Sequence, residues 1–127
     1  MCNTASSSAV FNFCNPVPRQ LVNLQQCNPI FQPCPSGPFT YFTNPTTVTV
    51  NGSFTVVNTS ANCTMNIVYV HGGTSTAFAL AGGRSETIFF EDLTSITIEC
   101  LMGTIPEANC SGNLLLDLHY CVRCVSA

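Results

Sequence analysis

Nine cysteines make thiol chemistry the most conspicuous property of this 127-residue chain. Cysteine at this density is typical of disulfide frameworks, which form in oxidising compartments, or of metal sites. The count is odd, so at least one thiol in each chain is free or pairs with its own counterpart in another copy. The first residues lack the basic and apolar regions of a signal peptide. We therefore expect either bound metal or a protein that is made with reduced thiols and oxidised later, outside or after lysis of the cell that made it.

The Cys121-Val-Arg-Cys124 pair has the spacing of a zinc knuckle or a redox-active pair. A four-cysteine zinc site needs a second such pair, which the sequence does not contain. A thioredoxin-like role needs the pair at the N-terminus of a helix, whereas this pair ends a predicted strand. His71 and His119 are far apart in sequence and lack a serine or cysteine in the arrangement typical of a catalytic triad. The sequence therefore predicts no metal, no cofactor and no catalytic residue.

The first 17 residues, MCNTASSSAVFNFCNPV, contain no charged side chain and no helical periodicity. Extended chain from Cys2 to Cys14 would reach about 40 Å, whereas a compact domain of this size is ~35 Å wide. We interpret residues 1–17 as a connector arm that touches a neighbouring copy, and residues 18–127 as the folded domain. The alternative is a disordered terminus with two incidental thiols. The apolar side chains with which the arm would dock are Val10, Phe11 and Phe13.

Charged residues make up only 7% of the chain, and its three cations are all arginines. An ordinary soluble domain has about 25% charged residues, and their repulsion opposes self-association. The chain is therefore expected to assemble with copies of itself. A net charge of −3 argues against nucleic-acid binding. No window approaches the roughly 18 apolar residues of a membrane-spanning helix, so no membrane partner is expected.

Beyond Pro38 the sequence alternates between runs rich in Thr, Val and Phe and short turn signals. Asn51-Gly52 is a strong hairpin or bend signal, and Gly112 indicates a break before the last strand. This spacing, without a credible amphipathic helix, predicts an all-β fold, a two-sheet sandwich of the immunoglobulin or jelly-roll kind. The other turn signals are Asn44-Pro45, Gly72-Gly73 and Gly82-Gly83. The predicted strands span residues 39–43, 46–58, 63–70, 76–80, 85–91, 94–102 and 113–124.

The segment from residue 16 to residue 38 is rich in proline, asparagine and glutamine. Its apolar residues at 21, 22 and 24 indicate a short strand, while the prolines disfavour a helix or a long central strand. Cys27 and Cys34 lie in this segment. They either bridge each other or accept a bond from the arm of another copy.

Side chains alternate between the two faces of a strand, which sorts the remaining cysteines. Cys63, Cys100 and Cys124 fall on core faces, where a free cysteine behaves as a small hydrophobe, so we expect a structural role for them. Met102 shares the core face of Cys100. In the last strand Cys121 falls on the outward face. The candidates for disulfides between copies are Cys2, Cys14, Cys27, Cys34 and Cys121.

Two stretches carry a family resemblance: GGRSETIFFEDLTSITIEC at residues 82–100 and GNLLLDLHYCVRC at residues 112–124. With the cysteine-bearing arm and the Thr/Val-rich strands, they resemble the subunits of bacterial endospore appendages, the pilus-like fibres on spores of the Bacillus cereus group. The resemblance covers most of the chain. It implies a jelly-roll β-sandwich of about eight strands, with an extended N-terminal connector arm that forms disulfides with subunits further along a fibre.

Connectors of the helical, staggered fibres in that family carry adjacent cysteines, whereas Cys2 and Cys14 are separated here. The variety built from stacked rings joined by connectors is therefore the better match. The sequence and the resemblance together predict a structural protein that self-assembles into disulfide-crosslinked fibres on the endospore surface. Its partners would be copies of itself and a spore-surface anchor protein. The resemblance implies synthesis in the mother cell and exposure when that cell lyses.

The competing interpretation is a non-fibrous binding module with a β-sandwich fold, such as a spore-coat, capsid or tail domain that recognises a ligand on exposed loops. An enzyme comes third, because no motif supports catalysis.

Overall fold

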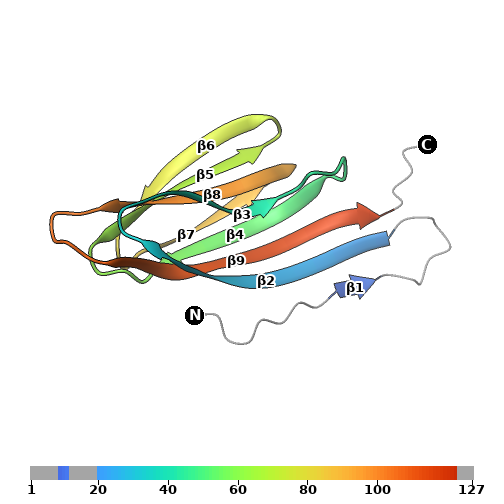
Figure 1. Ribbon diagram of the computed structural model, residues 1–127. Coiled ribbons are helices and arrows are strands. Elements are labelled where there is room, and N and C mark those ends of the chain that lie inside the picture. Colours follow the sequence, from blue (N-terminus) through green and yellow to red (C-terminus); the bar gives the residue numbers. More distant parts are fainter. Residues whose placement is uncertain (1–8, 12–19, 123–127) are drawn as a thin grey trace.

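The computed structural model describes the backbone of residues 9–11 and 20–122 and the side chains of residues 22–120. These residues form two antiparallel sheets packed face to face (Figure 1). Sheet A has the strand order β1-β2-β9-β4-β7, and sheet B has the order β3-β8-β5-β6. The strands are β1 (Ala9–Phe11), β2 (Gln20–Pro33), β3 (Ser36–Thr43), β4 (Val50–Asn58), β5 (Cys63–His71), β6 (Thr74–Leu80), β7 (Ser85–Phe90), β8 (Leu93–Met102) and β9 (Asn109–Val122).

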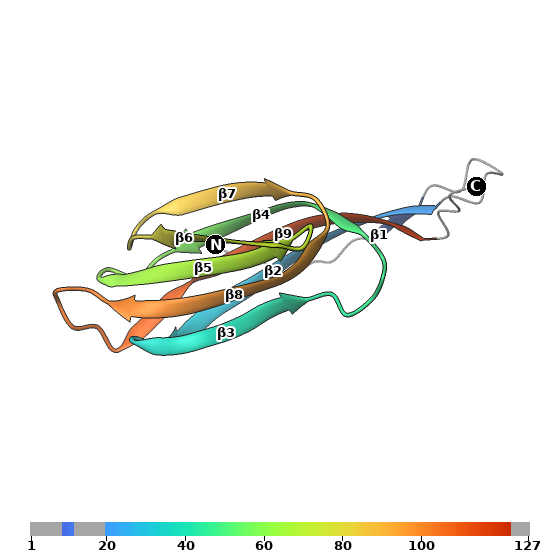
Figure 2. The same ribbon diagram turned by 90° about the horizontal axis from the view of Figure 1, so that it is seen from above.

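From β2 onward, the chain passes between the two sheets in the manner of a jelly roll, which confirms the predicted all-β sandwich. Figure 2 shows β7 and β6 along one flank of the sandwich and β3 along the other. Within the described ranges, no helix is long and apolar enough to cross a membrane.

The core lies between the inward faces of the two sheets. Burial alternates residue by residue along β5, as the sequence pattern predicts. Phe54 of β4 is fully buried, and its ring meets Tyr69 of β5 edge to face with 5.3 Å between centroids. Met102 is 46% exposed, so its predicted place in the core was wrong. It is the last residue of β8, where burial ends, since Leu101 before it is also exposed.

β2 runs without interruption from Gln20 to Pro33, although only a short strand was predicted near its start. The reason is its position in sheet A. β1 pairs only with residues 22–24 of β2, so among the described strands none pairs with the rest of β2 on that side. A proline on an open edge removes no ladder hydrogen bond on that side. Pro29 and Pro33 lie in this open part and remain in register with β9.

Two glycines lie inside strands because the neighbouring backbone leaves no room for a side chain. Gly52 of β4 has a φ of 143°, and a Cβ there would collide with the carbonyl oxygen of Asp117 in β9. A Cβ at Gly112 of β9 would collide with the carbonyl oxygen of Val57 in β4. The predicted hairpin at Gly52 and break at Gly112 were therefore wrong. Both glycines mark a close approach of two strands.

Replacing Gly52 by alanine should destabilise the domain strongly. We expect Gly52→Ala to lower the free energy of unfolding by at least about 2 kcal/mol, because the clash is with backbone and the φ is unfavourable for a side chain. Gly37→Ala is the matched control, since a Cβ there meets nothing within 4 Å. It should change stability by less than about 0.5 kcal/mol. Urea denaturation of both variants checks this, and equal effects would contradict it.

The polar side chain of Gln32 in β2 is buried in the core, with 1% of its surface exposed. Its amide nitrogen donates to the Ser36 hydroxyl at 2.7 Å and to the Ile98 carbonyl at 3.1 Å. The Tyr41 hydroxyl donates to its amide oxygen at 2.6 Å. Burial raises the pKa of Tyr41, so the phenol stays protonated and keeps this bond. The network joins β2 of sheet A to β3 and β8 of sheet B.

Candidate functional site

Two disulfides lie at one end of the sandwich. Cys34, just after β2, is bonded to Cys63 at the start of β5, and Cys100 of β8 is bonded to Cys110 of β9. The second bridge joins the two sheets directly. All four cysteines are buried, and the Cys34 backbone N–H donates to the carbonyl of Ala108 next to the second bridge. Both bridges therefore stabilise the same end of the fold.

These pairings correct part of the sequence interpretation. Cys63 and Cys100 are buried as predicted, but both are oxidised rather than free thiols. Cys34, expected to bond either to Cys27 or to another copy, is bonded to Cys63 of its own chain. The alternation of strand residues gives the face of a cysteine but not its partner, which depends on which strands meet at the end of the sandwich.

Cys110 is the one bridging cysteine to which the sequence interpretation gave no role. A local signal for it exists, because ten residues separate it from Cys100 and the segment between them contains glycine and proline. The loop brings the Cα atoms of the two cysteines to 6.3 Å, within the range of disulfides.

The remaining cysteine candidates lie elsewhere. Cys27 is in β2 opposite Leu115, and it too is disulfide-bonded. Cys121 is in β9 at the register position of Leu21, and its side chain falls outside the described part. The other predicted positions outside the described residues are Cys2, Phe13, Cys14 and Cys124.

The arm residues that the structure describes form β1. Val10 and Phe11 lie in β1, opposite Asn23 and Val22 of β2. This short pairing was not expected from the sequence. β1 therefore extends sheet A by three residues along its outer edge.

The strands at the rims of the two sheets form open edges. β7 and β6 end their sheets on one flank, and β3 ends sheet B on the opposite flank (Figure 2). β3 and β6 contain no charged residue, and β7 contains only Glu86. Natural edges are usually protected by charges, particularly lysine, because unpaired backbone groups are a template for another strand. Among the described strands, these edges lack that protection.

Large apolar side chains are exposed on or near the same rims. Phe89 of β7 is 81% exposed and Phe39 of β3 is 44% exposed. At the β3 edge, the exposed ring of Phe39 would add hydrophobic burial to a pairing between copies.

The two histidines are not part of a catalytic arrangement in the described side chains. His71 Nε2 lies 3.0 Å from the Thr76 hydroxyl, and His119 Nδ1 lies 3.1 Å from Asn23 Oδ1. In the described part of the chain, no cluster of three or more His, Cys, Asp or Glu is placed to hold a metal ion. The described residues therefore offer two features for contact with other chains, the cysteines and the open sheet edges.

Comparison with known proteins identifies the family of this chain. The family model for endospore appendages matches residues 11–122. A solved structure from work describing Bacillus endospore appendages as a family of disulfide-linked pili is similar, with a TM-score of 0.61 and 16% identity over 86% of this chain and 96% of that chain. A cupin domain from Bordetella pertussis has a TM-score of 0.31 and 8% identity over 92% and 98%, too distant to carry an argument. No curated protein matches the sequence.

Proposed function

The chain belongs to the endospore appendage family, and we propose that it self-assembles into disulfide-crosslinked, pilus-like fibres on the spore surface. Family membership supports a structural, pilus-like subunit rather than an enzyme. The structural observation that carries the proposal is the pair of uncharged, open sheet edges on opposite flanks.

Lateral contacts would come from edge pairing between neighbouring sandwiches. An edge on one flank that pairs with an edge on the opposite flank of the next copy is a heterologous contact, which repeats to give rings or helical filaments. β3 and β6 are the two open edges of sheet B, so β3 of one copy would meet β6 of the next. Main-chain hydrogen bonds supply this contact with little need for charge.

Longitudinal contacts would come from the arm. Cys2 and Cys14 are the proposed donors, Val10, Phe11 and Phe13 the docking side chains, and Cys121 the acceptor on the sandwich of another copy. Cys27 is already bonded in the single chain, so it could accept an arm cysteine only by thiol–disulfide exchange. Cys34 is not proposed as a partner for another copy, because its bond to Cys63 is buried within the fold.

The proposal also covers where the subunit is made and how it reaches the spore surface. The subunit would be made without a signal peptide in the mother cell, become extracellular on lysis, and attach to the spore through an anchor protein. Stacked rings joined by connectors remain the proposed architecture, with residues 1–17 as the connector and residues 18–127 as the jelly-roll domain.

Purified protein should assemble without any other component. Electron micrographs should show fibres or rings, and non-reducing gels of assembled material should show a ladder or protein that fails to enter. With reductant and heat, the same samples should collapse to one monomer band, since disulfides are the only expected covalent links.

A single monomer band without reductant would rule out the covalent fibre. A monodisperse monomer in micrographs would favour the alternative, a non-fibrous binding module of the spore coat.

A further inference from the structure

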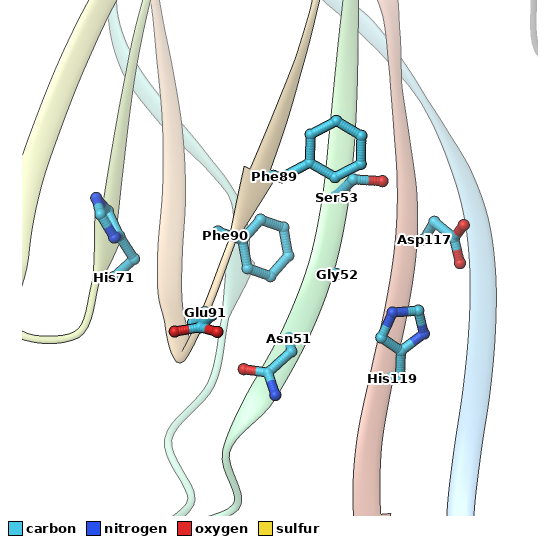
Figure 3. Close-up of a pocket in the computed structure, with 9 residues that line it drawn as sticks. All are labelled: Asn51, Gly52, Ser53, His71, Phe89, Phe90, Glu91, Asp117 and His119. Atoms are coloured by element: carbon cyan, nitrogen blue, oxygen red, sulfur yellow. The ribbon is translucent and has the colours of Figure 1, made fainter.

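An open groove of about 550 Å³ lies at one end of sheet A (Figure 3). Outward side chains of three adjacent strands form its floor: Phe89 of β7 pairs with Ser53 of β4, which pairs with Asp117 of β9. In the next row, Asn51 of β4 pairs with His119 of β9. Adjacent strands are about 4.8 Å apart and same-face rows about 7 Å, so the floor is roughly 10 Å by 7 Å.

The most exposed large apolar side chain of the described residues, Phe89, lies at the margin of this floor with 81% of its surface open. Figure 3 shows its ring beside Ser53, with Asp117 on the far side. An aromatic ring presented in this way beside polar groups is a surface on which a flat, weakly polar ligand face can stack.

Existing hydrogen bonds determine what the polar groups of the groove can still offer. Asn51 Oδ1 accepts from the Asp92 backbone N–H at 2.9 Å, which leaves the Asn51 amide nitrogen as a donor. Asn23 Oδ1 can only accept, so the hydrogen of this bond lies on His119 Nδ1, and the Asp117 carboxylate supplies acceptor oxygens. The groove thus presents donors and acceptors together.

We propose that this groove binds a neutral saccharide. One face of a pyranose ring stacks on Phe89, and its hydroxyls bond to the Asp117 carboxylate and the Asn51 amide. A hydroxyl both donates and accepts, so a sugar satisfies the mixed set of groups. Glucose-configured rings fit best, because their equatorial hydroxyls leave both ring faces apolar.

Other ligand classes match the groove less well. An anion would be repelled by the exposed carboxylates of Asp117 and Glu91, both of which line it. A cation could stack on Phe89 and pair with Asp117. It has no acceptor for the Asn51 amide, whereas a sugar hydroxyl does.

A shallow site of this kind binds weakly, because few groups contact the ligand and the groove is open to water. The site belongs to the single subunit and does not depend on assembly. If the proposed fibre forms, each fibre repeats the site many times, and linked weak sites bind a polymeric ligand 10² to 10⁴ times more tightly than one site alone, by the usual order of magnitude. This gain rests on the proposed function, and the site itself does not.

The test uses the full chain and cellotetraose, a linear oligomer of glucose. Saturation-transfer NMR detects contact through the protons of the sugar, so it works on subunits and on fibres alike. We expect transfer to the ring protons with the wild type, and an affinity at least about tenfold weaker for Phe89→Ala. Phe31→Ala is the matched control, because Phe31 is 68% exposed on β2 opposite Ser111, outside the groove. It should bind cellotetraose as the wild type does.

Asp117→Asn separates a sugar from a cation, since the amide keeps an acceptor oxygen but loses the charge. Cellotetraose binding should survive with a loss of less than about tenfold, while Asp117→Ala should weaken it further. No transfer to cellotetraose, equal losses in Phe31→Ala and Phe89→Ala, or binding of tetramethylammonium in preference to the sugar would each overturn the proposal. Fibre formation is scored separately by microscopy, so failure of the fibre and failure of the groove are distinguishable.

Discussion

Deletion of residues 1–17 should abolish long fibres while leaving the domain folded. The deletion removes β1, which contributes only three residues at the outer edge of sheet A. The core and both described disulfides lie in the remaining chain. Thermal unfolding should therefore change little, whereas each ring loses the segments that reach the next one. Micrographs should show rings or short arcs and no long fibres.

A milder variant controls for the loss of apolar contacts. With Cys2→Ser and Cys14→Ser together, the arm keeps Val10, Phe11 and Phe13, so fibres should form but come apart in denaturant or acid. Long, denaturant-resistant fibres from the truncated protein would show that the arm is an ordinary terminus without a role in assembly.

Removal of the two disulfides at the end of the sandwich, Cys34–Cys63 and Cys100–Cys110, should have the largest effect on stability. Chain-entropy arguments give about 3.6 kcal/mol for the bridge between Cys34 and Cys63 and about 2.7 kcal/mol for that between Cys100 and Cys110. These values follow from sequence separations of 29 and 10 residues. Paired Cys→Ala substitutions avoid leaving single thiols, and alanine leaves no buried polar group unpaired. Denaturant unfolding should show the larger loss for the Cys34→Ala, Cys63→Ala variant.

Removing both bridges should cost about 6 kcal/mol, comparable with the whole stability of a small domain. We expect this four-alanine variant to be largely unfolded at 37 °C. The wild type in strong reductant should behave in the same way. Unchanged denaturation midpoints in reductant would show that the bridges do not stabilise the fold.

Much of the fold follows from local patterns in the sequence. The alternation of apolar and polar residues in β5 and β9 predicts which face is buried, because one face of each strand packs against the other sheet. The turns at Gly72-Gly73 and Gly82-Gly83 are confirmed, since these loops need backbone conformations that glycine adopts readily.

The errors have a common physical origin in contacts between distant strands. Pro29 is compatible with a long strand because no strand of the described part pairs with β2 on that side at this position. Gly52 and Gly112 are required by the approach of β4 and β9, which no local signal reveals. The partner of Cys34 depends on where β5 begins in space. The groove around Phe89 likewise combines β4, β7 and β9, so its residues could not be grouped from the sequence.

The long pairing of β2 with β9 has a mechanical consequence. The two strands are in register from Gln20 and Val122 at one end to Pro33 and Asn109 at the other. Tension that entered through the proposed arm would pull β2 along its own axis from Gln20. All the backbone hydrogen bonds between the two strands would then be loaded together in shear, and they would not break one after another. Resistance to forced unfolding depends on the barrier to this concerted step.

A disulfide lies just beyond the paired part of β2, because Cys34 follows β2 and is bonded to Cys63. A pull that disturbed β2 would be passed to β5 of the other sheet before the strand could be extracted. In a fibre of such subunits, stretching would therefore lengthen the connectors between rings before it unfolded the sandwiches.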